Sequence, residues 1–242
     1  MVIGCYYYTT VDPNYEGKDE KDLLVFGDSE EAIFAYQSDK IQLREPIKVR
    51  IDKEIITTTI GRIFFNEILP IGLRYNNAPV KAGTIKSIIT KALRMYPQEE
   101  VVVLIDAIKK IGFDGASSCG GLSASVFDNV IVPEKKEILD DTENKIKEIE
   151  GNYQQGLITL EEKKRLSNEI WIEVTERLAD LTWANMKENN PVKMIIESGG
   201  ARASKDQLNQ LAAIKGLVVD PLGKIVELPT KSNYREGLSI FE

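Results

Sequence analysis

The spacing of apolar positions predicts a mainly helical chain. From Thr84 to Tyr96, apolar residues recur at helical spacing behind a threonine cap. The same period runs from Val101 to Ile111, up to Gly112, so we expect a helix there rather than a buried strand. Gly112 to Ser123 is rich in glycine and serine. We interpret it as a flexible connector, although its glycines could also cradle an anion.

Two long amphipathic segments then predict an antiparallel helical hairpin. Pro133 stands in the first turn of the first helix, which ends near Gly151, and Thr159 with Glu162 forms a capping box for the second. The facing apolar stripes consist of Leu139, Thr142, Ile146, Ile149 and Tyr153 in the first helix and Leu166, Ile170, Val174, Leu178 and Leu181 in the second. The acidic outer faces are most simply a solvated surface.

Patterns with a period of two are short. Ile47, Val49 and Ile51 alternate with charged residues, as in a half-buried strand, and the β-branched stretch Ile55 to Ile60 continues the pattern. A short helix capped by Ser29 precedes them. The sequence therefore predicts a small β component near the beginning of the chain.

A second β element is expected near the other end. Leu217 to Val219 and Ile225 to Leu228 flank Asp220-Pro-Leu-Gly223, which has the residues of a type I turn, so this stretch predicts a small β-hairpin. The expected fold class is therefore α+β, predominantly helical. The pattern divides the chain into four consecutive segments, residues 1–60, 61–131, 132–190 and 191–242.

The composition excludes several kinds of site. The chain of 242 residues has no histidine, so it contains no Ser-His nucleophile pair, His-ligated metal or histidine general base. Cys5 and Cys119 form neither a disulfide framework nor a CxxC pair, which fits a reducing cytosol. The net charge of −7 argues against a free-standing nucleic-acid binder. No apolar run approaches the roughly 20 residues of a membrane span, so we expect a cytoplasmic protein with no membrane partner.

A glycine-arginine turn precedes a predicted helix start. Ser204 and Gln207 form a capping box, which predicts a helix over about Lys205 to Ile214 with Gly216 just past its end. The turn, Gly199-Gly-Ala-Arg202, then lies at the positive end of that helix. Free amides and a guanidinium there suit a phosphate. The alternative is a tight connector, since no Walker-type Gly-Lys-Ser/Thr follows.

Several stretches of this sequence resemble stretches of one protein family and follow one another in the same order as there. They are Val2–Tyr7, Glu31–Tyr36, Ile47–Arg50, Thr59–Pro70, Pro133–Lys136, Tyr153–Thr159, Ile170–Trp171, Ser198–Ser204, Gln207–Leu217 and Leu228–Leu238. Together they resemble the largest subunit of bacterial RNA polymerase, the β′ chain. The resemblance covers essentially the whole chain and implies a role in transcription.

The resemblance implies an architecture and partners. Residues 61–131 would form a helical funnel around the secondary channel, and residues 132–190 the rim helices, which receive factors that insert a coiled coil. Residues 191–242 would form the F-loop segment, which leads to the bridge helix where this sequence ends. Implied partners are the β, α, ω and σ subunits, the rest of β′ and the nucleoside triphosphate, with DNA and RNA reached only through the assembled enzyme.

The resemblance also implies roles for individual residues. Arg202 would face the triphosphate of the incoming nucleotide, and its guanidinium suits a bidentate phosphate contact. The other implied positions are Gln207, Gln210 and Lys215 near the channel, and Asn233 and Arg235 as ion-paired groups on the approach to the bridge helix. The loop departs from the family pattern by one additional glycine and by Ala203 in place of glycine.

The catalytic motif of that family does not occur in this sequence. The aspartate triad that holds magnesium in the polymerase is absent, and Asp106, Asp114 and Asp128 occur singly. The chain is therefore expected to be part of a nucleotidyltransferase without being catalytic alone, and to hold no cofactor, with Mg²⁺ bound by residues outside it. The alternative is an autonomous interaction module whose hairpin binds a protein and whose Gly-Gly-Ala-Arg turn binds a phosphorylated ligand.

Overall fold

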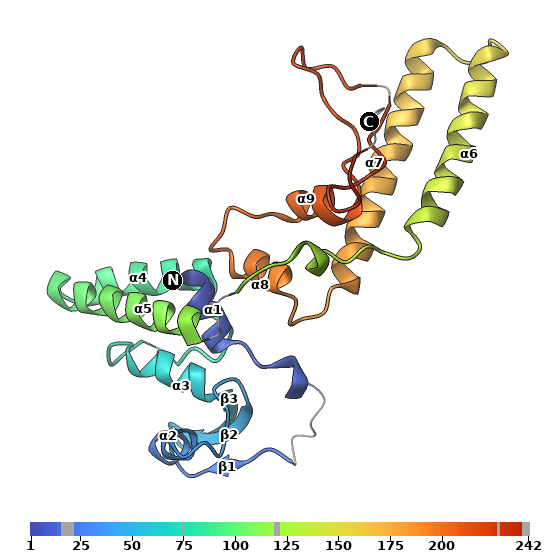
Figure 1. Ribbon diagram of the computed structural model, residues 1–242. Coiled ribbons are helices and arrows are strands. Elements are labelled where there is room, and N and C mark those ends of the chain that lie inside the picture. Colours follow the sequence, from blue (N-terminus) through green and yellow to red (C-terminus); the bar gives the residue numbers. More distant parts are fainter. Residues whose placement is uncertain (16–21, 74, 119–121, 227, 239–242) are drawn as a thin grey trace. The chain divides into compact units, whose positions relative to one another are not determined.

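The computed structural model describes residues 1–15, 22–73, 75–118, 122–226 and 228–238 (Figure 1). The chain forms two compact units, each discontinuous in sequence. The first unit is Met1–Ser123 with Lys193–Arg202, and the second is Ala124–Val192 with Ala203–Glu242. Helices predominate beside a single three-stranded sheet within the described ranges, which confirms the predicted α+β class. The division into four consecutive segments stays a prediction.

A small sheet and two helices form one end of the first unit. Their bounds are β1 Val25–Phe26, α2 Ser29–Gln37, β2 Pro46–Ile51, β3 Glu54–Thr59 and α3 Ile60–Glu67, after a short 3₁₀ turn η1 at Pro13–Tyr15. β1 pairs parallel to β2, and β2 pairs antiparallel to β3. Ile47 and Val49 are fully buried, as the alternating pattern predicted. They pack in an apolar cluster with residues of α2 and α3, so the sheet is covered on that face.

Two predicted helix caps are wrong. The cap of α2 is Asp28, whose Oδ1 accepts a hydrogen bond from the Glu31 amide at 2.8 Å, and Ser29 is the first helical residue. α4 (Ala82–Met95) begins two residues before Thr84, so that threonine lies inside the helix. Both corrections have one reason: the capping residue needs an extended backbone, and the extended position falls one to three residues earlier than predicted.

Three helices supply most of the larger apolar cluster of the first unit, which Phe65 of α3 and Val80 complete. α1 (Val2–Thr9) lies beside α5 (Gln98–Ser118), and α4 packs on α5. The structure confirms a helix at 101–111. It also extends that helix to residue 118, so the predicted connector is wrong over 112–118, and its residues 119–121 lie outside the described part of the chain.

The glycines of the expected connector belong to a close helix crossing. A Cβ atom built on Gly4 would lie 1.8 Å from the Gly112 carbonyl oxygen, and one on Gly115 would lie 2.6 Å from the Gly4 carbonyl oxygen. Neither distance is possible for a real side chain. The absence of side chains at these positions lets the α1 and α5 backbones touch, and this gain in packing outweighs the modest helix-breaking tendency of glycine.

The second unit contains the helical hairpin. Its elements are η2 Val126–Asp128, α6 Lys135–Gln154, α7 Leu160–Asn185, α9 Lys205–Leu208 and the π turn η3 Asn209–Ala213; α8 (Pro191–Ser198) joins it to the second piece of the first unit. Figure 1 shows α6 and α7 running antiparallel and joined by a short turn, as predicted. α6 extends three residues beyond Gly151, and Thr159 Oγ1 accepts from the Glu162 amide at 3.2 Å.

The hairpin shares its apolar core with η3. Trp171 and Leu178 of α7 and Ile138 of α6 are buried, and they pack with Ala213 and Ile214. Leu178 belongs to the predicted stripe, whereas Trp171 stands one position beside it. The apolar faces of the two helices therefore stabilise both the hairpin and the π turn against it.

The predicted β-hairpin near the end of the chain is confirmed in a reduced form. Two isolated bridges, Gly216 to Thr230 and Val219 to Ile225, hold its arms together. The Gly223 amide donates to the Asp220 carbonyl at 3.0 Å, which closes the predicted turn. Because pairing is limited to these bridges, the arms do not form continuous strands within residues 216–226 and 228–230.

Candidate functional site

The Gly-Gly turn is organised by the end of α8. Gly199 has φ +66°, and its amide donates to the Ile196 carbonyl at 3.2 Å, which ends the helix in a left-handed residue. The Gly200 amide donates to Ser198 Oγ at 3.1 Å, and a Cβ on Gly200 would lie 2.8 Å from Val2 Cβ. The structure thus explains why glycine occupies both positions, and the amides of both residues already donate hydrogen bonds within the protein. This geometry favours the connector interpretation of the glycines over a phosphate cradle.

Arg202 lies just after this turn and is exposed. Within the part of the chain that the structure describes, its guanidinium has no hydrogen-bond or ion-pair partner. The predicted capping box follows and is confirmed: the Gln207 amide donates to Ser204 Oγ at 3.4 Å, and Gln207 Oε1 accepts from the Ser204 amide at 3.1 Å. Gln207 is therefore occupied in starting the helix, whereas the Arg202 side chain is available to an anion.

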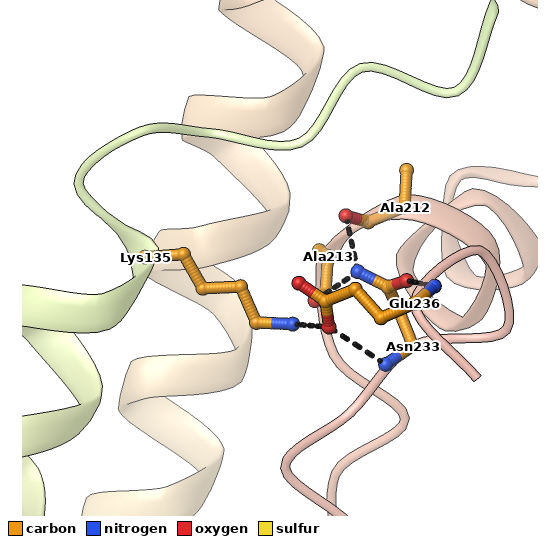
Figure 2. A network of polar contacts seen from close by, with 5 residues as sticks. All are labelled: Lys135, Ala212, Ala213, Asn233 and Glu236. Carbon is orange, nitrogen blue, oxygen red and sulfur yellow. Dashed lines mark hydrogen bonds and ion pairs between the residues drawn. The ribbon is translucent and has the colours of Figure 1, made fainter. Parts of the chain in front are cut away.

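The predicted helix changes type after its first turn. Residues 205–208 are α-helical, residues 209–213 form the π turn η3, and Ile214 is extended. The last carbonyl groups of a helical segment have no donor within it. Asn233, which is fully buried, supplies one: its Nδ2 donates to the Ala212 carbonyl at 2.9 Å and to the Ala213 carbonyl at 3.2 Å (Figure 2).

An ion pair extends this network to the start of the helical hairpin. The Glu236 amide donates to Asn233 Oδ1 at 2.8 Å, and Glu236 Oε2 accepts from the Asn233 amide at 3.3 Å and from Lys135 Nζ (Figure 2). The Lys135 side chain is 8% exposed, so its charge needs this carboxylate. The network ties the first turn of α6 to residues 233–236 and, through Asn233, to the π turn.

Five of the six sequence-predicted residues belong to the second unit, and Gln210, Lys215, Asn233 and Arg235 are brought together there. The Gln210 carbonyl accepts from the Tyr234 amide at 3.0 Å, and Lys215 Nζ lies 5.4 Å from the centroid of the Tyr234 ring. Arg235 donates to the Asn129 carbonyl. The expected ion pairs at Asn233 and Arg235 are replaced by bonds to carbonyls. The ion pair is made instead by Lys135 and Glu236, which the sequence reasoning missed because no local pattern links residues 101 positions apart.

A cavity of about 510 Å³ adjoins Lys215, between α7 and the α9–η3 helix. Its charged lining residues are the basic Lys205 and Lys215 and the acidic Glu176, Asp180 and Asp206. Lys205 Nζ lies 4.8 Å from the centroid of the Trp183 ring, and Lys215 also stacks on an aromatic ring. The acidic residues offset the lysines, so this cavity does not select an anion.

The carboxylates of the described residues are dispersed. No group of three or more His, Cys, Asp or Glu residues suited to a metal ion occurs among the described residues. Asp106 pairs with Lys109 at 2.5 Å, and Asp128 accepts from the Ser125 amide at 2.6 Å as part of a capping box. Residues of this kind do not fit a catalytic magnesium site. The described helices also include none that is both long and apolar enough to cross a membrane.

Comparisons with known proteins identify close relatives. The chain is 38% identical over 245 aligned residues to the protein named DNA-directed RNA polymerase subunit beta' of Thermosipho africanus (strain TCF52B), covering the whole chain and 15% of the relative. It is 39% identical over 243 residues to the protein of that name from Desulforudis audaxviator (strain MP104C), covering 20% of it. The chain thus spans between about a seventh and a fifth of the length of these curated relatives.

The family model with the description "RNA polymerase Rpb1, domain 3" matches residues 1–129. The match takes in the three-stranded sheet, the crossing of α1 with α5, and η2, and it covers more than half of the 242 residues. The chain therefore belongs to the RNA polymerase Rpb1 domain 3 family.

Proposed function

We propose that the chain acts as part of the β′ subunit of a DNA-directed RNA polymerase, in transcription. In this role it forms a wall of the secondary channel through which nucleotides enter, and it offers the helical hairpin to regulators. The observation that carries the proposal is the alignment of the whole chain with a protein of that name at 38% identity. Its partners are then the β, α, ω and σ subunits and the rest of β′.

The hairpin suits a docking role for a coiled-coil factor. α6 and α7 bury their apolar stripes against one another, which leaves their charged faces to solvent. Leu157 and Leu160 at the hairpin turn are 69% and 45% exposed. An exposed apolar tip flanked by charged helices can recognise a partner through both burial and charge.

Arg202 is the residue of this chain that would contact the nucleotide. Its exposure and the absence of a partner among the described side chains support a contact with the triphosphate. The glycine amides take no part, because they bond within the turn. Gln207, Gln210, Lys215, Asn233 and Arg235 would act as positioning residues, which hold the F-loop segment through caps and carbonyl bonds.

The catalytic magnesium would be held by residues outside this chain. The dispersed carboxylates of the described residues do not fit that ion. The chain would therefore contribute substrate access and orientation to the nucleotidyltransferase reaction, whereas bond formation would require the assembled enzyme.

Purification under native conditions tests the assignment. An antibody to this chain, applied to a lysate of the source cells, should capture the other polymerase subunits together with these residues. Capture of a free polypeptide of about the 27.2 kDa of this chain, without polymerase subunits, would contradict the proposal and leave the autonomous interaction module as the function to pursue.

A kinetic experiment tests Arg202. Arg202→Ala in the assembled polymerase should raise the KM for nucleotides at least about tenfold, since a charge-assisted hydrogen bond contributes about 1.5–3 kcal/mol. The KM of Arg202→Lys should lie between those of the wild type and Arg202→Ala, because lysine keeps the charge and loses the bidentate geometry. Arg177→Ala, at an exposed arginine of α7, is the matched control. An unchanged KM in Arg202→Ala would remove the assignment.

A further inference from the structure

The cavity beside Lys215 lies within the second unit and has a volume of about 510 Å³. Its lining comes from one face of α7 over residues 172–180, from residues 205–209 of α9 and η3, and from residues 215–217. The structure describes every residue of these ranges. The volume is in the range of small-molecule sites. Among the six residues assigned to the nucleotide channel, Lys215 alone lines this cavity.

The charged groups of this cavity have both signs. They are Glu176 and Asp180, one turn apart on α7, Asp206 of α9, and the basic residues Lys205 and Lys215. Three negative and two positive side chains give the lining a net charge of −1. Among the described residues, none of these five side chains makes an ion pair or a side-chain hydrogen bond. The charges therefore do not neutralise one another in pairs, and both signs are available to a ligand.

The two lysines are positioned by aromatic rings and not by the carboxylates. Lys205 Nζ lies 4.8 Å from the centroid of the Trp183 ring, and Lys215 Nζ lies 5.4 Å from that of Tyr234. The face of a ring attracts an ammonium group, but it leaves N–H donors of that group to other acceptors. Each lysine can therefore still donate to a carboxylate that a ligand brings into the cavity.

Uncharged groups complete the lining. Asn209 is half-buried, and its side-chain amide has no hydrogen-bond partner within the described part of the chain, so it can both donate to a ligand and accept from it. Ile172 is 48% exposed, and Leu217 is half-buried. These two side chains offer an apolar surface that would gain free energy from covering by an aliphatic chain.

We propose that this cavity binds a small zwitterion of the basic α-amino acid class. The carboxylate of the ligand would meet the two lysines, its two cationic groups would meet the three acidic side chains, and its methylene chain would cover Ile172 and Leu217. Such a ligand has a net charge of +1, which complements the −1 of the lining. The site does not depend on the polymerase assignment, because its ligand contacts this chain alone.

A series of ligands on the unchanged chain tests both signs of the site. Isothermal titration of the 242-residue chain with L-arginine should show saturable binding of one molecule. L-Citrulline replaces the guanidinium by a neutral group of similar shape, and agmatine lacks the carboxylate, so each should bind about fivefold more weakly. Absence of saturable L-arginine binding would overturn the proposal. Agmatine binding as tightly as L-arginine would also overturn it, because the acidic residues would then act alone.

Two glutamates provide a matched pair of variants. Glu176→Lys reverses a charge in the cavity and should weaken L-arginine binding about tenfold. Glu148→Lys changes the net charge equally, but Glu148 is exposed on α6 and does not line the cavity, so the affinity should change less than about twofold. Equal effects of the two substitutions would contradict the proposed site and indicate attraction by the overall charge.

A lysine variant separates the carboxylate contact from the cationic contacts. Lys205→Gln removes one of the two positive groups of the cavity and should weaken L-arginine binding about fivefold. It should not weaken the binding of agmatine, which has no carboxylate to lose a partner. Circular dichroism and the thermal unfolding curve check that the variant remains folded. Unchanged L-arginine binding, or equal weakening of both ligands, in a folded Lys205→Gln chain would overturn the proposal.

Discussion

The two units of the chain are stabilised in different ways. The first unit has two apolar clusters, with nine and seven buried residues among those described, and its helices cross where glycines let backbones touch. The second has one cluster of five buried residues, and it relies on ties between distant segments, such as Asn233 with the π turn and Lys135 with Glu236.

This difference predicts different sensitivities. A close backbone crossing tolerates no added atom, because the neighbouring atoms are main-chain atoms that cannot rotate away. A hydrogen-bonded tie tolerates changes of volume better, but it fails when a donor is removed and a buried carbonyl is left unsatisfied. Substitutions in the first unit should therefore act through volume, and those in the second through loss of a partner.

The largest effect should come from one methyl group at the helix crossing. Gly4→Ala places a Cβ 1.8 Å from the Gly112 carbonyl oxygen, so α1 and α5 must separate. We expect a loss of about 3 kcal/mol in the free energy of unfolding, measured by urea denaturation. Gly151→Ala on α6 is the same substitution with nothing within 4 Å of the new methyl group, and it should stabilise by about 0.5–1 kcal/mol. Equal effects of the two would refute the backbone crossing.

A smaller loss should follow from removing the amide of Asn233. Asn233→Leu keeps the approximate volume and leaves the buried carbonyls of Ala212 and Ala213 without their donor. We expect the free energy of unfolding to fall by about 2 kcal/mol. Asn144→Leu on the exposed face of α6 is the control and should stay within about 0.5 kcal/mol of the wild type. An Asn233→Leu chain as stable as the wild type would show that these hydrogen bonds contribute little to the free energy of unfolding.

The smallest effect concerns an ion pair on the surface of the second unit. The hydrogen bond from Lys231 lowers the pKa of Glu143 below its ordinary value, with a further contribution from the lysine charge. A depressed carboxyl pKa stabilises the folded state above the unfolded pKa, and this stabilisation is lost as the pH falls through the folded pKa. Because both side chains are partly exposed, screening limits the contribution to less than about 1 kcal/mol.

The pH dependence of unfolding measures this contribution. Glu143→Gln should be slightly less stable than the wild type at neutral pH and equal to it at a pH well below the carboxyl pKa. Glu148→Gln, at an exposed glutamate of the same helix, should have the same free energy of unfolding as the wild type at both pH values. If the difference in the free energy of unfolding between the wild type and Glu143→Gln grew as the pH fell, the trend would be opposite to the expected one and the ion pair would not be its cause.

Periodic patterns made the long elements of the fold predictable from the sequence. The stripes at Leu178 and Ile146 and the alternation at Ile47 report side chains that face a core, and burial confirms them. The glycines at 112 and 115 led to the wrong prediction of a connector, because the same residue breaks an exposed helix and permits a close helix crossing. A sequence does not show which backbone lies opposite, so only the folded structure separates the two cases.

The candidate site was predictable where its signals are local. The capping box of Ser204 with Gln207 is a pattern four residues long, and the structure confirms it. The π turn and its bonds to Asn233 depend on residues twenty or more positions apart. The bond between Lys135 and Glu236 spans 101 positions. Contacts of this range leave no periodic trace in one sequence.

The discontinuity of the first unit has a consequence for synthesis on the ribosome. Tyr6 Oη donates to Glu197 Oε2 at 2.6 Å, a contact between residues 191 positions apart. The α6–α7 hairpin lies between them in the chain and depends on much shorter-range pairing, so its helices can pair before the ribosome has made the last piece of the first unit. The nascent chain would thus carry a formed hairpin while Tyr6 of α1 still awaits its hydrogen-bond acceptor Glu197.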